Sequence, residues 1–165
     1  MKNNNFGKVY FASPWFTPTQ AEREDRVKNK LRELGFDVWS PKDNNSLSPI
    51  TDPAIREQIF AANVSGMEDC SIIFAITDEK DMGTIWECGF VYGMRNELRK
   101  VGKDLVDENK VGPIIVYYCE TLGSGMFNLM LAQSGDIVIT DFADLDKLPE
   151  LISKGEGQAY VGIVE

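Results

Sequence analysis

The feature that most restricts how this 165-residue chain can fold is the alternation of short strand-like runs with longer helical segments. Residues 71–76 form a continuous apolar run, which is typical of a parallel strand covered on both faces. The other strand-like runs are 9–12, 36–39, 114–118 and 137–139. Helical segments are expected at about 17–34, 53–68, from 84 onward, 126–132 and 143–153. This order predicts a single domain over residues 1–165 with an α/β fold: an open, doubly wound sheet of about five mainly parallel strands with helices on both faces.

The charge and hydropathy of the chain exclude several classes of partner. It has 17 basic and 26 acidic side chains, a net charge of −9, and no dense cluster of Lys and Arg, so nucleic acid is not an expected partner. No apolar run approaches the ~20 residues of a membrane span, so no membrane association is expected. The N-terminal residues lack the apolar core of a signal peptide, and the expected location is cytoplasmic.

The absence of histidine restricts the chemistry. It removes Ser-His-Asp and Cys-His mechanisms and histidine-ligated metals. The three cysteines, Cys70, Cys88 and Cys119, are widely spaced and indicate neither a disulfide framework nor a zinc site. The chain also lacks the glycine-rich motifs of dinucleotide and nucleoside triphosphate sites. We therefore expect no cofactor and no metal, and a reaction carried by carboxylates, tyrosines, amides, hydroxyls or lysines.

Glu87 is the side chain most in need of an explanation, because it is a lone carboxylate in the apolar first turns of a helix. One interpretation is structural: Thr84 and Glu87 have the spacing of a capping box. The other is functional: Glu87 lies in a cleft as a nucleophile, kept ionised by the helix dipole, which supplies about 0.3–1 kcal/mol. Gly89 and Gly93, four residues apart, are expected to let this helix pack close to the sheet.

The predicted topology gathers a candidate site around Glu87. Ligands of doubly wound sheets bind outside the carboxyl ends of the strands, where the loops after strands one, three and four meet. The side chains expected there are Tyr10, Trp15, Phe16, Asp81, Glu87 and Asn128. The aromatic residues could instead be core packing, and Asp81 could be a helix-capping acid. The polar loop 40–50 is long enough to form a lid or a binding loop.

Four motifs, in this order and spacing, resemble the nucleoside 2-deoxyribosyltransferase family over nearly the whole chain. They are residues 10–16 (Tyr-Phe-Ala-Ser-Pro-Trp-Phe), Asp81-x-Gly83-Thr84-x-x-Glu87-x-Gly89, Asn128-Leu129-Met130 and Tyr160-Val161-Gly162. The resemblance implies a flavodoxin-like sheet and an enzyme that moves a 2-deoxyribosyl group between nucleobases, through a covalent sugar–enzyme intermediate, in nucleoside salvage. It also implies 2-deoxynucleosides and free nucleobases as partners, and a dimer-based homo-oligomer, up to a hexamer, with sites shared between subunits.

The resemblance also implies roles for individual residues. Glu87 matches the nucleophile, and Tyr10 the tyrosine that orients it. Asp81 and Asn128 match the pair that holds the 5′-hydroxyl of the sugar, with Asn128 supplied by the adjacent subunit. The remaining substrate-binding positions are Trp15 and Phe16 beside the base, with Gly83 and Met130 in the same motifs.

The proposed chemistry fits these residues. A carboxylate below the anomeric carbon can trap an oxocarbenium-like state and preserve configuration by double displacement. The carboxylate of Asp81 would accept a hydrogen bond from the 5′-hydroxyl of the sugar but would repel a 5′-phosphate. This favours nucleosides over nucleotides as substrates.

Two positions depart from the family pattern. Many relatives have an aspartate that protonates the leaving base where this chain has Asn63, and an amide cannot donate a proton in that way. Either Asn63 is a recognition group, or another acid or water protonates the base, and the nearest acids in the sequence are Asp43 and Asp81. Some relatives also end in an aromatic residue that reaches a neighbouring site, where this chain has Glu165.

Alternatives to the transferase remain open on the sequence. A nucleoside or nucleotide N-glycosidase would use the same Glu87 and let water complete the second step. A non-catalytic flavodoxin-like binding module would need no nucleophile. Within the transferase interpretation, the Ser13-Pro14 turn and residues 128–133 resemble purine-preferring relatives, so purine transfer is expected.

Overall fold

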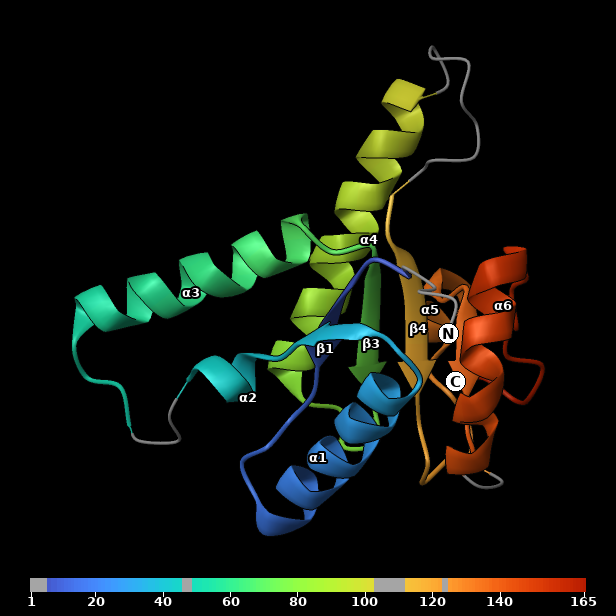
Figure 1. The fold of residues 1–165 in the computed structure, drawn as a ribbon, viewed down its shortest axis with the longest axis horizontal. Coiled ribbons are helices and arrows are strands. Elements are labelled where there is room, and N and C mark those ends of the chain that lie inside the picture. Colours follow the sequence, from blue (N-terminus) through green and yellow to red (C-terminus); the bar gives the residue numbers. More distant parts are fainter. Residues whose placement is uncertain (1–5, 46–48, 103–111, 123–124) are drawn as a thin grey trace.

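The computed structural model describes residues 6–45, 49–102, 112–122 and 125–165. Its centre is a five-stranded sheet in the order β2-β1-β3-β4-β5, and all four strand pairings are parallel (Figure 1). The strands are β1 (Lys8–Ala12), β2 (Asp37–Trp39), β3 (Ile72–Ile76), β4 (Ile114–Tyr118) and β5 (Ile137–Ile139). This is the strand order of flavodoxin-like folds, and the predicted doubly wound α/β sheet is confirmed.

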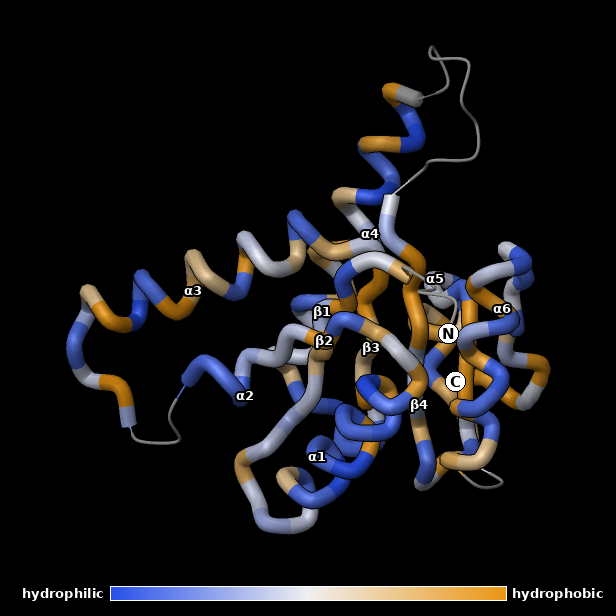
Figure 2. The backbone as a smooth tube through the Cα atoms, in the orientation of Figure 1, coloured by the Kyte–Doolittle hydropathy of each residue, from blue (hydrophilic) through white to orange (hydrophobic). Residues whose placement is uncertain are grey.

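Helices cover both faces of the sheet. They are α1 (Pro18–Glu33), α2 (Pro41–Asn44), α3 (Pro53–Glu68), α4 (Met82–Gly102), α5 (Leu129–Ser134), the 3-10 helix η1 (Phe142–Lys147) and α6 (Leu148–Lys154). Alternate residues of β1 point to opposite faces, so Val9 and Phe11 pack under α1, η1 and α6, while Tyr10 and Ala12 pack under α4, α5 and the C-terminal end of α3. Figure 2 shows the apolar residues gathered along the strands.

The helix boundaries follow from local capping. Thr17 caps α1 in a capping box with Gln20, and Gly35, at φ 92°, follows the end of that helix. Asp52 caps α3, and Pro53 occupies its first turn. Two predicted helices are shifted: α5 begins at Leu129 rather than near 126, and the last helix is divided between η1 and α6. The polar loop 40–50 contains α2, and residues 46–48 lie outside the described part of the chain.

The structural interpretation of Glu87, a capping box with Thr84, is wrong. Asp81 caps α4 instead, because its Oδ2 accepts a hydrogen bond from the Thr84 backbone N–H at 2.8 Å. Thr84 Oγ1 is buried and has no hydrogen-bond partner among the described residues. The residue preceding the helix, rather than one inside its first turn, therefore supplies the cap, and Glu87 is left for another contact.

The predicted role of Gly89 and Gly93 is also wrong. Both are exposed, and a Cβ added to either would meet nothing within 4 Å outside the local helix backbone. The face of α4 that packs on the sheet is formed instead by four buried residues: Thr84, Cys88, Val91 and Arg95. These residues recur at the i, i+4, i+7, i+11 spacing of one helix face.

Candidate active site

Tyr10 and Glu87 form a hydrogen-bonded pair at the centre of the candidate site. Tyr10 lies in β1 on the face covered by α3 and α4, and its side chain is fully buried. Its hydroxyl donates to Glu87 Oε1 at 2.6 Å, a length typical of a strong bond to a carboxylate. The pair joins residues 77 positions apart in the sequence. The side chains matched to the nucleophile and its orienting tyrosine thus meet in the fold.

The environment of Glu87 determines its protonation. Burial raises its pKa to about 7, the hydrogen bond from Tyr10 lowers it in part, and the charge of Asp81 raises it again. The helix dipole therefore does not keep Glu87 fully ionised, and the carboxyl is about half protonated at neutral pH. Burial, followed by the charge of Glu87, raises the pKa of Tyr10 far above its usual range, so that hydroxyl remains a hydrogen-bond donor.

Asp81 and Gly83 lie together at the start of α4. A Cβ added to Gly83 would lie 3.2 Å from Asp81 Oδ2, so the absence of a side chain at Gly83 leaves room for that carboxylate. Asp81 is close enough to Glu87 for its charge to raise the pKa of Glu87. The capping role does not exclude a substrate role, because a carboxylate can accept several hydrogen bonds.

The last turns of α3 form a second wall beside Tyr10. A Cβ added to Gly66 would lie 3.2 Å from the rings of both Tyr10 and Trp39. Asn63 lies one turn earlier on the same face of α3. Its Oδ1 is buried and has no partner among the described residues, which suits it to receive a hydrogen bond from a ligand.

The aromatic residues after β1 form a stacked pair. The rings of Trp15 and Phe16 lie 5.2 Å apart, and Phe16 is exposed. Trp15 Nε1 is buried without a partner among the described residues, so a donor as well as an apolar surface is present. These residues follow the same strand as Tyr10. They are not part of the buried core, so the core-packing interpretation does not apply to them.

Asp43 is held in a different environment. It lies in α2 and bonds Lys28 at 2.5 Å and Arg32 at 2.6 Å. Burial raises its pKa, but the hydrogen bonds from these two cations outweigh that effect, and the net shift is downward. A carboxylate that holds its charge so firmly is a poor proton donor, which argues against Asp43 as the acid for a leaving base.

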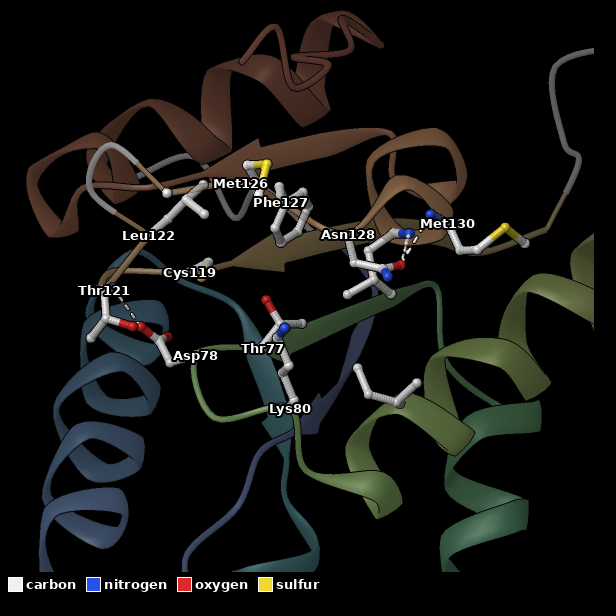
Figure 3. A pocket seen from close by; sticks show the side chains of 13 residues that line it. Thr77, Asp78, Lys80, Cys119, Thr121, Leu122, Met126, Phe127, Asn128 and Met130 are labelled. Carbon is white, nitrogen blue, oxygen red and sulfur yellow. Dashed lines mark hydrogen bonds between the residues drawn. The ribbon is translucent and has the colours of Figure 1, made fainter. Parts of the chain in front are cut away.

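Asn128 and Met130 line a separate cavity of about 530 Å³ between the loops that follow β3 and β4 (Figure 3). Asn128 also caps α5, accepting hydrogen bonds from the backbone N–H groups of Met130 and Leu131. Ile85 lines this cavity, whereas Tyr10, Asp81 and Glu87 do not. Ile85 and Glu87 are two residues apart on α4 and so project about 200° from each other. Within one chain, Asn128 therefore lies across α4 from Glu87.

Trp39 is a residue of this site that the sequence analysis missed. Its ring stacks on that of Tyr10 with centroids 5.1 Å apart. The two residues are directly paired in the register of β1 and β2. An aromatic residue ending the strand next to Tyr10 was a usable signal, but only once the order and register of the strands were known.

Neither a metal site nor a membrane span is found in the parts of the chain that the structure describes. No group of three or more His, Cys, Asp or Glu side chains there could hold a metal ion. No helix within the described ranges is both long enough and apolar enough to cross a membrane.

The fold and the site define a flavodoxin-like α/β protein with a partly buried carboxylate at the carboxyl edge of its sheet. A family model described as nucleoside 2-deoxyribosyltransferase matches residues 9–130, and the chain belongs to that family. A comparison with curated protein sequences gave no significant match.

Solved structures share the fold at low sequence identity. A 2-deoxyribosyltransferase from Bacillus psychrosaccharolyticus superposes with a TM-score of 0.74 and 23% identity, over 93% of this chain and 99% of the other. A conserved protein from Enterococcus faecalis V583 gives a TM-score of 0.57 and 19% identity, over 90% of this chain and 98% of the other. Both similarities cover nearly the whole domain and support the fold.

Proposed function

We propose that this protein transfers 2-deoxyribosyl groups between nucleobases, in nucleoside salvage, with Glu87 as the nucleophile. The observation that carries the proposal is the partly buried pair of Tyr10 and Glu87, joined at 2.6 Å, in a member of this family. Glu87 is the carboxyl in this part of the fold whose pKa is raised toward neutrality, as expected for a group with a chemical role.

The reaction proceeds in two displacements. An ionised Glu87 oxygen attacks C1′ of the nucleoside, the C1′–N bond breaks, and the base leaves with the electron pair and takes up a proton. A nitrogen of the second base then attacks C1′, the sugar–carboxylate bond breaks, and that base loses a proton. Glu87 is regenerated and the configuration at C1′ is preserved. Tyr10 holds one carboxylate oxygen and leaves the other free to attack.

The substrate preference follows from Asp81 and Asn63. Asp81 accepts a hydrogen bond from the 5′-hydroxyl and disfavours a 5′-phosphate, because two negative charges would meet in a partly buried site. Asn63 recognises the base edge with its amide oxygen, which has no partner among the described residues, and Trp15 and Phe16 lie against the base, which we propose is a purine. Because Asp43 is paired with two cations, the proton for the leaving base comes from Asp81 or from water.

A homo-oligomer with shared sites is part of the proposal. α3 and α4 expose large apolar side chains, among them Phe60 (59%), Met82 (86%) and Trp86 (50%). The ring centroids of Phe60 and Trp86 lie 5.9 Å apart, so the two helices form one apolar surface. We propose that a second copy covers this surface. Because Asn128 lies across α4 from Glu87, it would complete the site of a neighbouring subunit.

The experiment that tests the function is a chromatographic assay with 2′-deoxyinosine, with and without adenine. The proposal predicts formation of 2′-deoxyadenosine and hypoxanthine. Release of hypoxanthine without a new nucleoside would indicate the hydrolase instead. No turnover with this pair or with a pyrimidine pair would refute the proposal and leave a binding module.

A matched pair of variants isolates the nucleophile. Glu87→Ala is expected to abolish transfer, whereas Glu97→Ala, which removes an exposed carboxylate from the same helix, should leave it unchanged. Intact-protein mass spectrometry of the unaltered enzyme with 2′-deoxyinosine alone should show an added 2-deoxyribosyl group. If the adduct still formed in Glu87→Ala, a residue other than Glu87 would be the nucleophile.

A further inference from the structure

The orientation of Tyr10 is determined by more than its hydrogen bond to Glu87. Its ring has close contacts with two other elements, β2 and α3. On one side, the Trp39 ring stacks on it at a centroid distance of 5.1 Å and an interplanar angle of 27°. At the edge of the ring, the backbone of α3 approaches at Gly66, where an added Cβ would lie 3.2 Å from Cδ2 and Cε2 of Tyr10.

Gly66 also lies close to Trp39, so one position on α3 limits the movement of both rings. The same added Cβ would lie 3.2 Å from Trp39 Cζ3. A methyl group at this position would therefore push on both rings at once. The stack itself is held by the backbone, since Tyr10 and Trp39 are paired in the register of β1 and β2. The stacked Trp39 ring on one face and the approach of α3 at one edge thus restrict how far the ring of Tyr10 can shift.

This restraint matters because the contact that Tyr10 makes is short and directional. A hydroxyl-to-carboxylate bond of 2.6 Å weakens as its angle departs from linearity, and steeply below about 120°. The hydroxyl is at the far end of the ring from the Cβ hinge, so a small tilt of the ring moves the oxygen by more than it moves the ring centre.

We infer that Trp39 and Gly66 are positioning residues for the transferase reaction, holding the ring of Tyr10 so that its hydroxyl remains on Glu87 Oε1. This inference rests on the proposed role of Glu87. Neither residue needs to touch the substrate: Trp39 supplies the stacking surface, and Gly66 supplies the space in which α3 can approach.

The test compares Gly66→Ala, Trp39→Ala and Trp39→Phe with the unaltered protein and with Tyr10→Phe. Alanine is a better helix former than glycine, so Gly66→Ala is expected to fold. The control is Ser65→Ala, a change of similar size at the exposed neighbouring position of the same helix. Thermal unfolding followed by circular dichroism establishes that each variant is folded before its kinetics are compared.

Gly66→Ala and Trp39→Ala are expected to lower kcat by roughly 10-fold, with little change in KM for 2′-deoxyinosine, because a small displacement affects the reacting geometry rather than substrate binding. The apparent pKa of kcat/KM should rise in both, in the direction of Tyr10→Phe, because the hydrogen bond from Tyr10 lowers the pKa of Glu87. Trp39→Phe should restore part of the loss. A lower kcat with an unchanged pH profile in both variants would overturn the inference.

A second measurement separates failure of this inference from failure of the proposed function. The side-chain carboxyl of Glu87 can be titrated by 13C NMR in protein labelled at glutamate, with Glu87→Gln identifying the resonance. Gly66→Ala should raise the midpoint and Ser65→Ala should not, whether or not the protein turns over 2′-deoxyinosine. An unchanged midpoint in Gly66→Ala would refute the positioning role even in an active transferase.

Discussion

Replacing Glu87 by glutamine is expected to stabilise the folded protein at pH 8 while abolishing transfer. Burial raises the pKa of Glu87 to about 7 from an ordinary value of 4.5, and the hydrogen bond from Tyr10 only partly opposes this. Between these two values the folded chain keeps a proton on Glu87 that the unfolded chain has released. The unfolded state then binds fewer protons, so the free energy of unfolding falls as the pH rises through this range.

The expected magnitude follows from the shift. Each pKa unit corresponds to about 1.4 kcal/mol, so an ionised Glu87 lowers the free energy of unfolding by up to about 3 kcal/mol at pH 8. Glutamine has nearly the same shape, accepts the hydrogen bond from Tyr10 and has no charge to bury. It should recover much of that free energy at pH 8, and less than about 1 kcal/mol at pH 5, where the carboxyl is mostly neutral when folded.

Urea unfolding at pH 5 and pH 8 measures the effect through the midpoint, provided that the m-value is unchanged. Glu97→Gln is the control, because Glu97 is an exposed carboxylate on the same helix and its loss should change stability by less than about 0.5 kcal/mol at either pH. The reasoning would be refuted if Glu87→Gln changed the free energy of unfolding equally at the two pH values, or lowered it only at pH 8. Either result would show that Glu87 carries no buried charge.

Three further predictions concern activity and assembly. First, kcat/KM should fall about 10-fold between pH 8 and pH 6, because attack requires the ionised form of a carboxyl whose pKa is about 7; a profile that is flat over this range would contradict it. Second, Asn63→Asp should raise kcat by roughly 10-fold or more near pH 6, because it supplies a proton donor for the leaving base. An unchanged steady-state rate would show that protonation of the base does not limit the reaction. Third, Trp86→Glu should reduce the molar mass measured by light scattering after size-exclusion chromatography, whereas Val161→Glu, at a position that is 96% exposed, should not; an unchanged mass in Trp86→Glu would place the interface elsewhere.

The fold was predictable because its signals are local and repeated. The run at 71–76 is apolar at nearly every position, and it became the central strand β3. The alternation of strands and helices then restricts the connections to a doubly wound parallel sheet, which places the residues after β1 and β3 at one edge. The meeting of Tyr10 and Glu87 follows from that topology.

The details of the site were not predictable, because each depends on a choice between contacts of similar strength. Asp81 and Thr84 are both good helix caps, and a single hydrogen bond decides that α4 begins after Asp81. The pKa of Glu87 depends on the depth of its burial, which the helix dipole, at about 0.3–1 kcal/mol, does not offset. Trp39 and Gly66 gain their importance only from the register of β1 and β2 and from the approach of α3.

α4 connects the proposed chemistry with the proposed assembly, because its faces meet different surroundings. One face, with Thr84 and Cys88, is buried on the sheet. On either side of that face lie Glu87, bonded to Tyr10, and Ile85, in the cavity that Asn128 also lines. Trp86 lies between them on the exposed face, about 100° from each. A partner that packs on Trp86 therefore approaches the nucleophile from one flank and the cavity from the other. Loss of that contact should reduce activity even though Trp86 itself takes no part in the reaction.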